Sequence, residues 1–174
     1  FKTKFACEVK NFKPEDYFDR KEVRKYDLFT IFALIAADED VKDSGLDLER
    51  INKDRVGVIF GSGIGGFNTF LSEVGDYFKG NKMPRFNPFF IPKMILDIAA
   101  GQISMRHNLR GPNYAVVSAC ASSTNAIIDA TMLLRLGKAD IIVAGGSEAV
   151  ISEAGVGGFN AMKAMSERND DPKT

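Results

Sequence analysis

The sequence has few of the residues from which metal sites and disulfide frameworks are built. Its 174 residues include two cysteines, Cys7 and Cys120, and one histidine, His107. This set is too small for a structural zinc site and does not resemble a disulfide framework. We therefore expect no bound metal and a reducing, cytoplasmic setting.

Excess charge of one sign and long apolar runs are missing as well. Lys+Arg and Asp+Glu number 23 each, so the formal net charge is zero, which argues against nucleic acid as the main ligand. The longest apolar run in the first half, residues 31–37, has seven residues, far fewer than a membrane span needs. No signal-peptide pattern opens the chain. We expect a soluble protein with no nucleic-acid or membrane partner.

Strand and helix patterns alternate along the part of the chain that is rich in apolar residues. Short apolar, often β-branched runs predict buried strands at 55–60, 114–118 and 140–144. Apolar residues at helical spacing predict helices at 28–43, 67–78, 93–108 and 122–136. Residues 1–27 and the proline-rich segment 80–92 are expected to be loops. The alternation predicts an α/β fold with a mostly parallel central sheet.

Two of these helices have apolar residues that identify an expected buried face. The helix at 28–43 is expected to end before Gly45, which suits a left-handed cap. The residues expected to be buried are Leu28, Ile31, Phe32, Ile35 and Ala36 in the first helix, and Ala126, Ile127, Ala130, Leu133 and Leu134 in the last.

The segment Gly61–Gly66 follows the first strand and fits the dinucleotide pattern G-x-G-x-x-G. A dinucleotide unit needs a second strand soon after the helix, ending in an acidic residue, whereas here the proline-rich segment follows. The segment is not a P-loop, because no Gly-Lys-Ser/Thr comes after it. The pattern is a weak indication of a nucleotide site. The alternative is a loop where backbones approach closely or a ligand passes.

Cys120 is the strongest chemical signal in the sequence. A strand ends at Ser118, a turn of small residues follows, and a helix begins at Ser122. Such a turn places a side chain at the carboxyl edge of an α/β sheet, where sites of this fold class lie. The helix start stabilises negative charge and offers N–H groups to an oxyanion. The alternative is a buried structural cysteine, since free cysteines are often buried. Cys7 has no such surroundings and is expected to be structural or incidental.

His107 is the one histidine that could serve a cysteine nucleophile as a base. It lies in Arg106-His107-Asn108, at the charged end of a predicted helix. A histidine there is often a surface residue that interacts favourably with the helix dipole. We therefore expect a nucleophile whose base is not His107.

The segment around Cys120 resembles the active-site segment of the β-ketoacyl-acyl carrier protein synthases, and the resemblance extends along essentially the whole chain. In its details it is most similar to the elongating type, synthase II. The segments that carry it, in family order, are 20–25, Gly61–Gly66, 87–92, 109–112, 117–123, Ala144–Glu148, 155–159 and 166–170.

The resemblance implies a thiolase-like layered α/β fold, of which residues 1–174 would be an incomplete N-terminal half. The family's opening strand and helix, and its entire C-terminal half with two catalytic histidines and a lysine, would lie outside this sequence. This would explain why no convincing base is found. No cofactor and no metal are implied.

The resemblance also implies roles for individual residues. Cys120 would be the nucleophile, accepting an acyl chain as a thioester, and its N–H would be one oxyanion donor. Malonyl-acyl carrier protein would then lose carbon dioxide, and its carbanion would attack the thioester. The acyl pocket would be lined by Ile64, Phe90 and Phe159.

Two interaction surfaces follow from the same resemblance. Lys21, Arg24, Lys25 and Arg85 would meet the acidic acyl carrier protein, although taken alone the first three suit a solvated helix face or turn. The strand at Tyr114–Ser118 would pair two subunits into a homodimer, since an exposed apolar edge needs a partner.

Other functions remain open at this point. A thiolase or a starter-condensing synthase would share the fold, but residues 88–92 and 155–159 favour the elongating type. A non-catalytic partner subunit would lack the nucleophile, so Cys120 argues against it. The 174 residues alone are expected to bind without turnover.

Overall fold

The computed structural model describes residues 1–173, which form two compact units. The larger unit runs from Pro14 to Ala149, and the smaller combines residues 1–13 with the stretch from 150 onward. The larger unit contains α1 (Arg20–Val23), α2 (Leu28–Asp43), β1 (Val56–Gly61), α3 (Phe67–Lys79), α4 (Phe90–Met94), α5 (Ile98–His107), β2 (Asn113–Val116), α6 (Ser122–Arg135) and β3 (Ile141–Gly146). The smaller unit contains α7 (Glu153–Ala161).

The sheet of the larger unit is parallel, in the order β2-β1-β3. In the central strand, Ile59 is in register with Tyr114 on one side and Ala144 on the other. Every residue of β1 is buried, as expected of a strand covered on both faces. This confirms the predicted α/β fold with a parallel sheet. It also places β2 at an edge of the described sheet.

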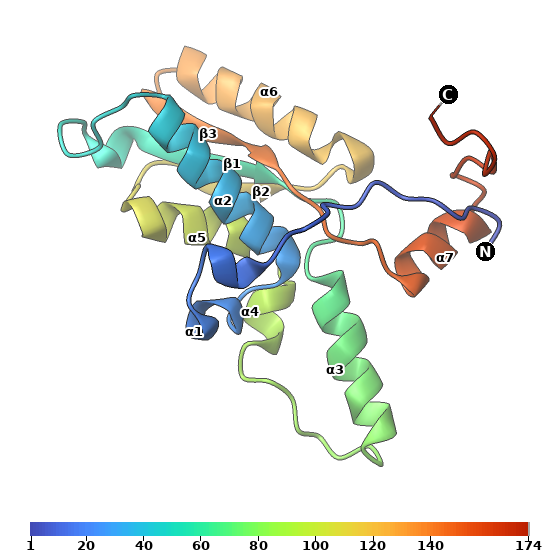
Figure 1. Ribbon diagram of the computed structural model, residues 1–174. Helices are drawn as coiled ribbons and strands as arrows, with labels where there is room; N and C mark the ends of the chain where they lie inside the picture. The colour runs from blue at the N-terminus through green and yellow to red at the C-terminus, as the bar shows by residue number, and fades with distance from the viewer. Residues whose placement is uncertain (174) are drawn as a thin grey trace. The chain divides into compact units, whose positions relative to one another are not determined.

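Helices cover the two faces of the sheet (Figure 1). Helix α6 packs over all three strands, with Ile59, Ala126 and Ala130 buried at the centre of that contact. Helices α2 and α5 pack on the other face, where Phe29, Leu34 and Ile103 are among the largest fully buried side chains. Helix α3 projects away from the sheet (Figure 1). The sheet is therefore the inner layer of the larger unit.

The predicted limits of α2 are confirmed at both ends, but of the residues predicted to be buried only Ile31 is fully buried. Asp27 caps the start through Phe29 N–H, and Gly45 follows the end with φ +67°. Residues 28–37 of the helix are apolar on nearly every side, so the contacts with α5 and β3, rather than the spacing, determine which side is buried. The buried residues are Phe29, Thr30, Ile31, Ala33, Leu34 and Ala37.

The other predicted elements are confirmed with three corrections, the first of which is that α1 forms inside the segment 1–27, which the sequence predicts as loop. In α6, Ile127 and Leu134 are 53% and 39% exposed, because only the alanine side of the helix faces the sheet. The predicted helix at 93–108 is two helices, α4 and α5. The first begins inside the predicted loop, with Pro92 in its first turn, where the missing N–H costs no hydrogen bond.

The smaller unit is held together by hydrogen bonds between its two segments. The N–H of Thr3 donates to Asn160 Oδ1 at 3.0 Å, and the Thr3 hydroxyl donates to the carbonyl of Ser166 at 2.6 Å. Asn169 accepts from Lys4 N–H and donates to the carbonyl of Lys2, both at 2.8 Å. Within residues 1–173, no helix is both long and apolar enough to cross a membrane.

Candidate active site

The turn between β2 and α6 exposes Cys120 at the carboxyl edge of the sheet. Cys120 lies in a 3-10 turn, Ala119–Ala121, and is exposed to solvent. The buried Ser122 hydroxyl holds this turn, accepting from Ser118 N–H at 2.9 Å and donating to the carbonyl of Ala119 at 2.7 Å. Asn125 donates to the Ser118 hydroxyl at 2.7 Å. The predicted strand–turn–helix arrangement is confirmed, and Cys120 is not buried within residues 1–173.

Close backbone contacts place the start of α6 directly over the strand ends. A Cβ on Gly61 would overlap the backbone of Ser122, and a Cβ on Gly146 would lie 2.5 Å from the carbonyl oxygen of Gly61. Ala119 has φ +50°, a left-handed conformation that costs an L-residue about 1–2 kcal/mol. The turn is thus built by small residues at fixed positions, and Cys120 stands immediately before the positive end of α6.

The Gly61–Gly66 loop is occupied by a carboxylate of the chain itself. Glu148 Oε2 accepts from Gly63 N–H at 2.8 Å and from Ile64 N–H at 2.9 Å, while Oε1 accepts from Gly65 N–H at 3.1 Å. Backbone N–H groups of this kind would otherwise hold a phosphate. The weak indication of a nucleotide site is therefore not supported, and the close-approach alternative describes the loop.

This loop lies against the Cys120 turn. A Cβ on Gly63 would lie 3.3 Å from the carbonyl oxygen of Ala119 and 3.2 Å from Glu148 Oε2. The Cys120 turn, the glycine loop and Glu148 therefore form one cluster at the carboxyl ends of the three strands. In the sequence Glu148 stands out only as part of a segment shared with the family. An acidic residue two positions after Gly146, where β3 ends, is the signal for its contact with the glycine loop.

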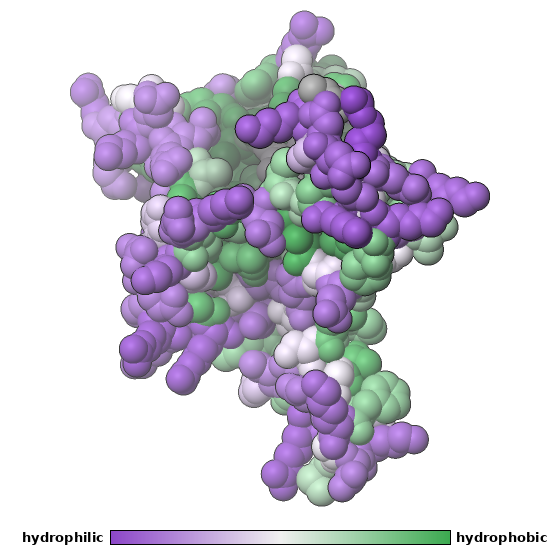
Figure 2. Space-filling model, turned by 45° about the vertical axis from the view of Figure 1, so that its right-hand side comes forward, coloured by the Kyte–Doolittle hydropathy of each residue, from purple (hydrophilic) through white to green (hydrophobic). Residues whose placement is uncertain are grey.

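The predicted acyl-pocket residues lie on different elements. Ile64 is on the glycine loop and is 40% exposed. Phe90 begins α4, is half-buried, and stacks on Phe70 and Phe86 with ring centroids 6.5 and 5.5 Å away. Figure 2 shows apolar surface along the projecting part of the larger unit formed by α3 and the segment after it. Phe159 is half-buried in α7 of the smaller unit. Their shared role stays a prediction.

The predicted basic surface is exposed. Lys21 lies in α1, and Arg24 and Lys25 follow it directly. A capping box orders this short helix: Asp19 accepts from the N–H groups of Lys21 and Glu22, and these bonds lower the pKa of Asp19. Arg85 is exposed in the segment between α3 and α4. These side chains are accessible to a partner, and their role stays a prediction.

His107 does not lie near the Cys120 turn in the fold. It ends α5, just ahead of the start of β2, whereas Cys120 follows the end of that strand. Its Nε2 lies 2.9 Å from Asp38 Oδ1, beside the pair that Arg106 makes with the same carboxylate. The expectation that His107 is not the base agrees with this position at the opposite edge of the sheet.

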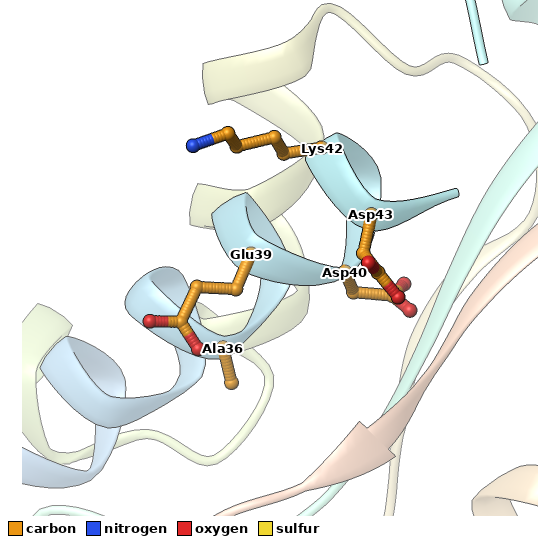
Figure 3. Close-up of a pocket in the computed structure, with 5 residues that line it drawn as sticks. All are labelled: Ala36, Glu39, Asp40, Lys42 and Asp43. Carbon is orange, nitrogen blue, oxygen red and sulfur yellow. The ribbon is translucent and has the colours of Figure 1, made fainter. Parts of the chain in front are cut away.

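A surface hollow of about 680 Å³ lies at the end of α2 (Figure 3). It is lined by Ala36, Glu39, Asp40, Lys42 and Asp43. In Figure 3 the side chains of Asp40 and Asp43 point to one side of the helix and Lys42 points to the other. No group of three or more potential metal ligands is found within residues 1–173. The hollow contains no cysteine, so the cluster around Cys120 is the candidate active site.

Comparison with known proteins gives relatives along the whole chain. The family model for the beta-ketoacyl synthase N-terminal domain matches residues 2–174. The chain is 46% identical over 170 residues to 3-oxoacyl-[acyl-carrier-protein] synthase 2 of Staphylococcus aureus, covering 97% of this chain and 41% of the relative. It is 42% identical over 174 residues to the Vibrio cholerae protein of the same name, covering 99% and 42%. The chain therefore spans about two fifths of these relatives.

Solved structures match the fold. A beta-ketoacyl synthase from Burkholderia phymatum STM815 superposes with a TM-score of 0.79 at 28% identity, covering 94% of this chain and 40% of that one. A chain from a type II PKS acyl-carrier protein in complex with its ketosynthase gives a TM-score of 0.78 at 20% identity, covering 94% and 45%. The latter likeness concerns the fold alone. The two superpositions confirm that this chain has part of the thiolase-like layered α/β fold.

Proposed function

The chain belongs to the β-ketoacyl synthase family, and we propose that it is the nucleophile-bearing part of a 3-oxoacyl-acyl carrier protein synthase of the elongating type. The observation that carries the proposal is the exposed thiol of Cys120 in the strand–turn–helix site at the carboxyl edge of the sheet. The match to relatives of which the chain covers 41% supports a longer subunit. On this proposal, the family's opening strand and helix and its C-terminal half lie outside residues 1–174.

The proposed reaction has two steps. The Cys120 thiolate attacks the thioester carbonyl of an acyl carrier protein, which forms an acyl-Cys120 thioester and releases the carrier thiol. Malonyl-acyl carrier protein then loses carbon dioxide, and its carbanion attacks the Cys120 thioester. The new carbon–carbon bond gives a 3-oxoacyl carrier protein and returns the thiolate. The N–H of Cys120 stabilises the oxyanion in both steps.

His107 takes no part in this scheme, because it lies with Asp38 at the opposite edge of the sheet. The groups that promote decarboxylation therefore come from the remainder of the subunit. Ile64, Phe90 and Phe159 line the acyl pocket of the assembled enzyme. No cofactor is required, because the carrier thiol leaves in the first step and carbon dioxide leaves in the second.

The proposed partner is acyl carrier protein in its acyl and malonyl forms. Lys21, Arg24, Lys25 and Arg85 are exposed and can meet an acidic partner, even though the net charge is zero. We also propose a homodimer through residues 114–118, because β2 is an edge strand and Val117 is 56% exposed. The proposed location is the cytoplasm.

Transfer of an acyl chain to Cys120 tests the proposal. The full-length protein is incubated with acyl-acyl carrier protein and analysed by intact and peptide mass. We expect one acyl group on Cys120, none in Cys120→Ala, and normal acylation in Cys7→Ala, since Cys7 lies in the smaller unit. Absence of acylation in the wild type, or acylation that persists in Cys120→Ala, would contradict the proposal.

Charge reversal tests the proposed carrier surface separately. Arg24→Glu with Lys25→Glu should slow acyl transfer strongly at low salt, where steering of an acidic partner is least screened. Lys42→Glu, an exposed residue at the end of α2, is the matched control and should transfer normally. An unchanged rate in the double variant at low salt would exclude this surface.

A further inference from the structure

Glu148 carries more backbone hydrogen bonds than its exposed position would lead one to expect. The residue is exposed, yet its two carboxylate oxygens accept from Gly63, Ile64 and Gly65 N–H groups at 2.8, 2.9 and 3.1 Å. The Ser62 hydroxyl points to Oε1 at a longer 3.4 Å. Charge-assisted bonds to a carboxylate are about twice as strong as neutral ones. The Glu148 carboxylate therefore holds the backbone of the glycine loop in place.

The glycine loop that Glu148 binds lies against the Cys120 turn. The position of a Cβ on Gly63 lies 3.2 Å from Glu148 Oε2 and 3.3 Å from the carbonyl oxygen of Ala119. Ala119 is the residue with φ +50°, directly before Cys120, and a strained conformation persists only where its surroundings hold it. The contact with Gly63 supplies part of those surroundings. The backbone hydrogen bonds of the Glu148 carboxylate go to Gly63, Ile64 and Gly65 and not to Cys120.

We propose that Glu148 is a positioning residue for Cys120, holding the glycine loop so that the loop in turn holds the strained turn before α6. The same bonds fix the backbone of Ile64, a residue proposed to line the acyl pocket. The inference rests on the proposed function for its catalytic meaning. Its structural content, that Glu148 controls the placement of the thiol, can be tested without any acyl carrier protein.

Alkylation with iodoacetamide measures this placement, because Cys7 provides an internal standard. Both thiols are exposed, and Cys7 lies in the smaller unit. The ratio of Cys120 to Cys7 labelling, measured by peptide mass, should fall several-fold in Glu148→Ala, because the reactivity of an exposed thiol depends on the charges and N–H groups that surround it. Glu39→Ala, which removes an exposed carboxylate at the end of α2, should leave the ratio unchanged. A wild-type ratio in Glu148→Ala would overturn the proposal.

Chemical rescue separates positioning from a general loss of structure. Formate is a carboxylate small enough to occupy the space that Glu148→Ala vacates, where the three N–H donors converge. Added formate should restore most of the labelling ratio in Glu148→Ala and should not change it in the wild type or in Glu39→Ala. A lowered ratio that formate does not raise would show that the carboxylate is not what positions the thiol.

Glu148→Gln keeps the proposal testable if the alanine variant does not fold. Glutamine retains one carbonyl oxygen but replaces the other oxygen with an NH₂ group. It can therefore accept from only some of the three loop N–H groups. Its labelling ratio should lie between those of the wild type and Glu148→Ala, and an unchanged ratio would overturn the inference. If the ratio responds as expected but the wild type accepts no acyl chain, the positioning role stands and the proposed function fails.

Discussion

The two edges of the sheet are built in different ways. The amino edge, where the strands start, is joined by ion pairs between exposed side chains: Arg55 with Asp140 and Arg110 with Asp54. The carboxyl edge has a carboxylate bound by backbone N–H groups, glycines without room for a Cβ, and a turn fastened by a buried serine. The exposed thiol is at the second edge.

The difference predicts different tolerance to substitution. Exposed ion pairs contribute about 0–1 kcal/mol each, because solvent screens them and long side chains lose freedom. Backbones in contact leave no room to relax, and overpacking costs about 1–3 kcal/mol or more. Substitutions at the carboxyl edge should therefore cost more stability than those at the amino edge, and should also change the reactivity of Cys120.

Gly61→Ala is expected to have the largest effect. Its Cβ would overlap the backbone of Ser122 and lie 2.6 Å from the backbone nitrogen of Ser123, so no flexible side chain can move aside. We expect the free energy of unfolding to fall by about 3 kcal/mol and Cys120 labelling to fall with it. Urea unfolding measures the first and alkylation the second.

Gly101→Ala is the matched control for that substitution. Gly101 lies inside α5, and a Cβ there would have nothing within 4 Å. Alanine in a helix interior should raise the free energy of unfolding by roughly 0.5–1 kcal/mol. Equal destabilisation by both variants would show that the close approach at Gly61 is not the cause.

Arg106→Ala tests the strongest group of contacts near the amino edge. Arg106 Nε lies 2.9 Å from both oxygens of Asp38, its guanidinium carbon lies 5.2 Å from the centroid of the Phe18 ring, and the bond to Asp38 raises the pKa of Arg106. We expect a loss of about 1–2 kcal/mol in urea unfolding, with Cys120 labelling unchanged. Arg106→Lys should recover only part, since lysine lacks the planar fork. Altered labelling would contradict the independence of the two edges.

Local signals were sufficient for most elements but not for how they pack. The bounds of α2 were predictable because Gly45 adopts the left-handed conformation after its end. Its buried face was not predictable, since residues 28–37 are apolar on nearly every side and could bury any of them. The contact of Glu148 with Ile64 joins residues 84 positions apart, and spacing along the chain carries no information about it. Cys120 was recognisable because strand, turn and helix are contiguous.

Ala119→Gly tests whether the turn before Cys120 stores strain. Glycine adopts φ +50° without the Cβ penalty, but it loses more freedom on folding, so the two effects partly cancel. We expect a gain of up to about 1 kcal/mol in urea unfolding. Ala121→Gly, at φ −92°, should give no gain. A loss of stability in Ala119→Gly that matches or exceeds the loss in Ala121→Gly would show that position 119 is not strained.

Asp140→Asn should have the smallest effect, and its pH dependence identifies its origin. Hydrogen bonds from Arg55 lower the pKa of Asp140 below its usual 3.8, so the folded state favours the carboxylate. A group with a lowered folded pKa stabilises the protein above its unfolded pKa and loses this contribution as the pH falls through the folded value. The melting temperature of wild type should therefore exceed that of Asp140→Asn from pH 7 down to about pH 5, and the gap should close progressively below pH 3.8. Because the pair is exposed, high salt should narrow the gap at pH 7. A gap that persists at low pH would mean that Asp140 acts through packing rather than charge.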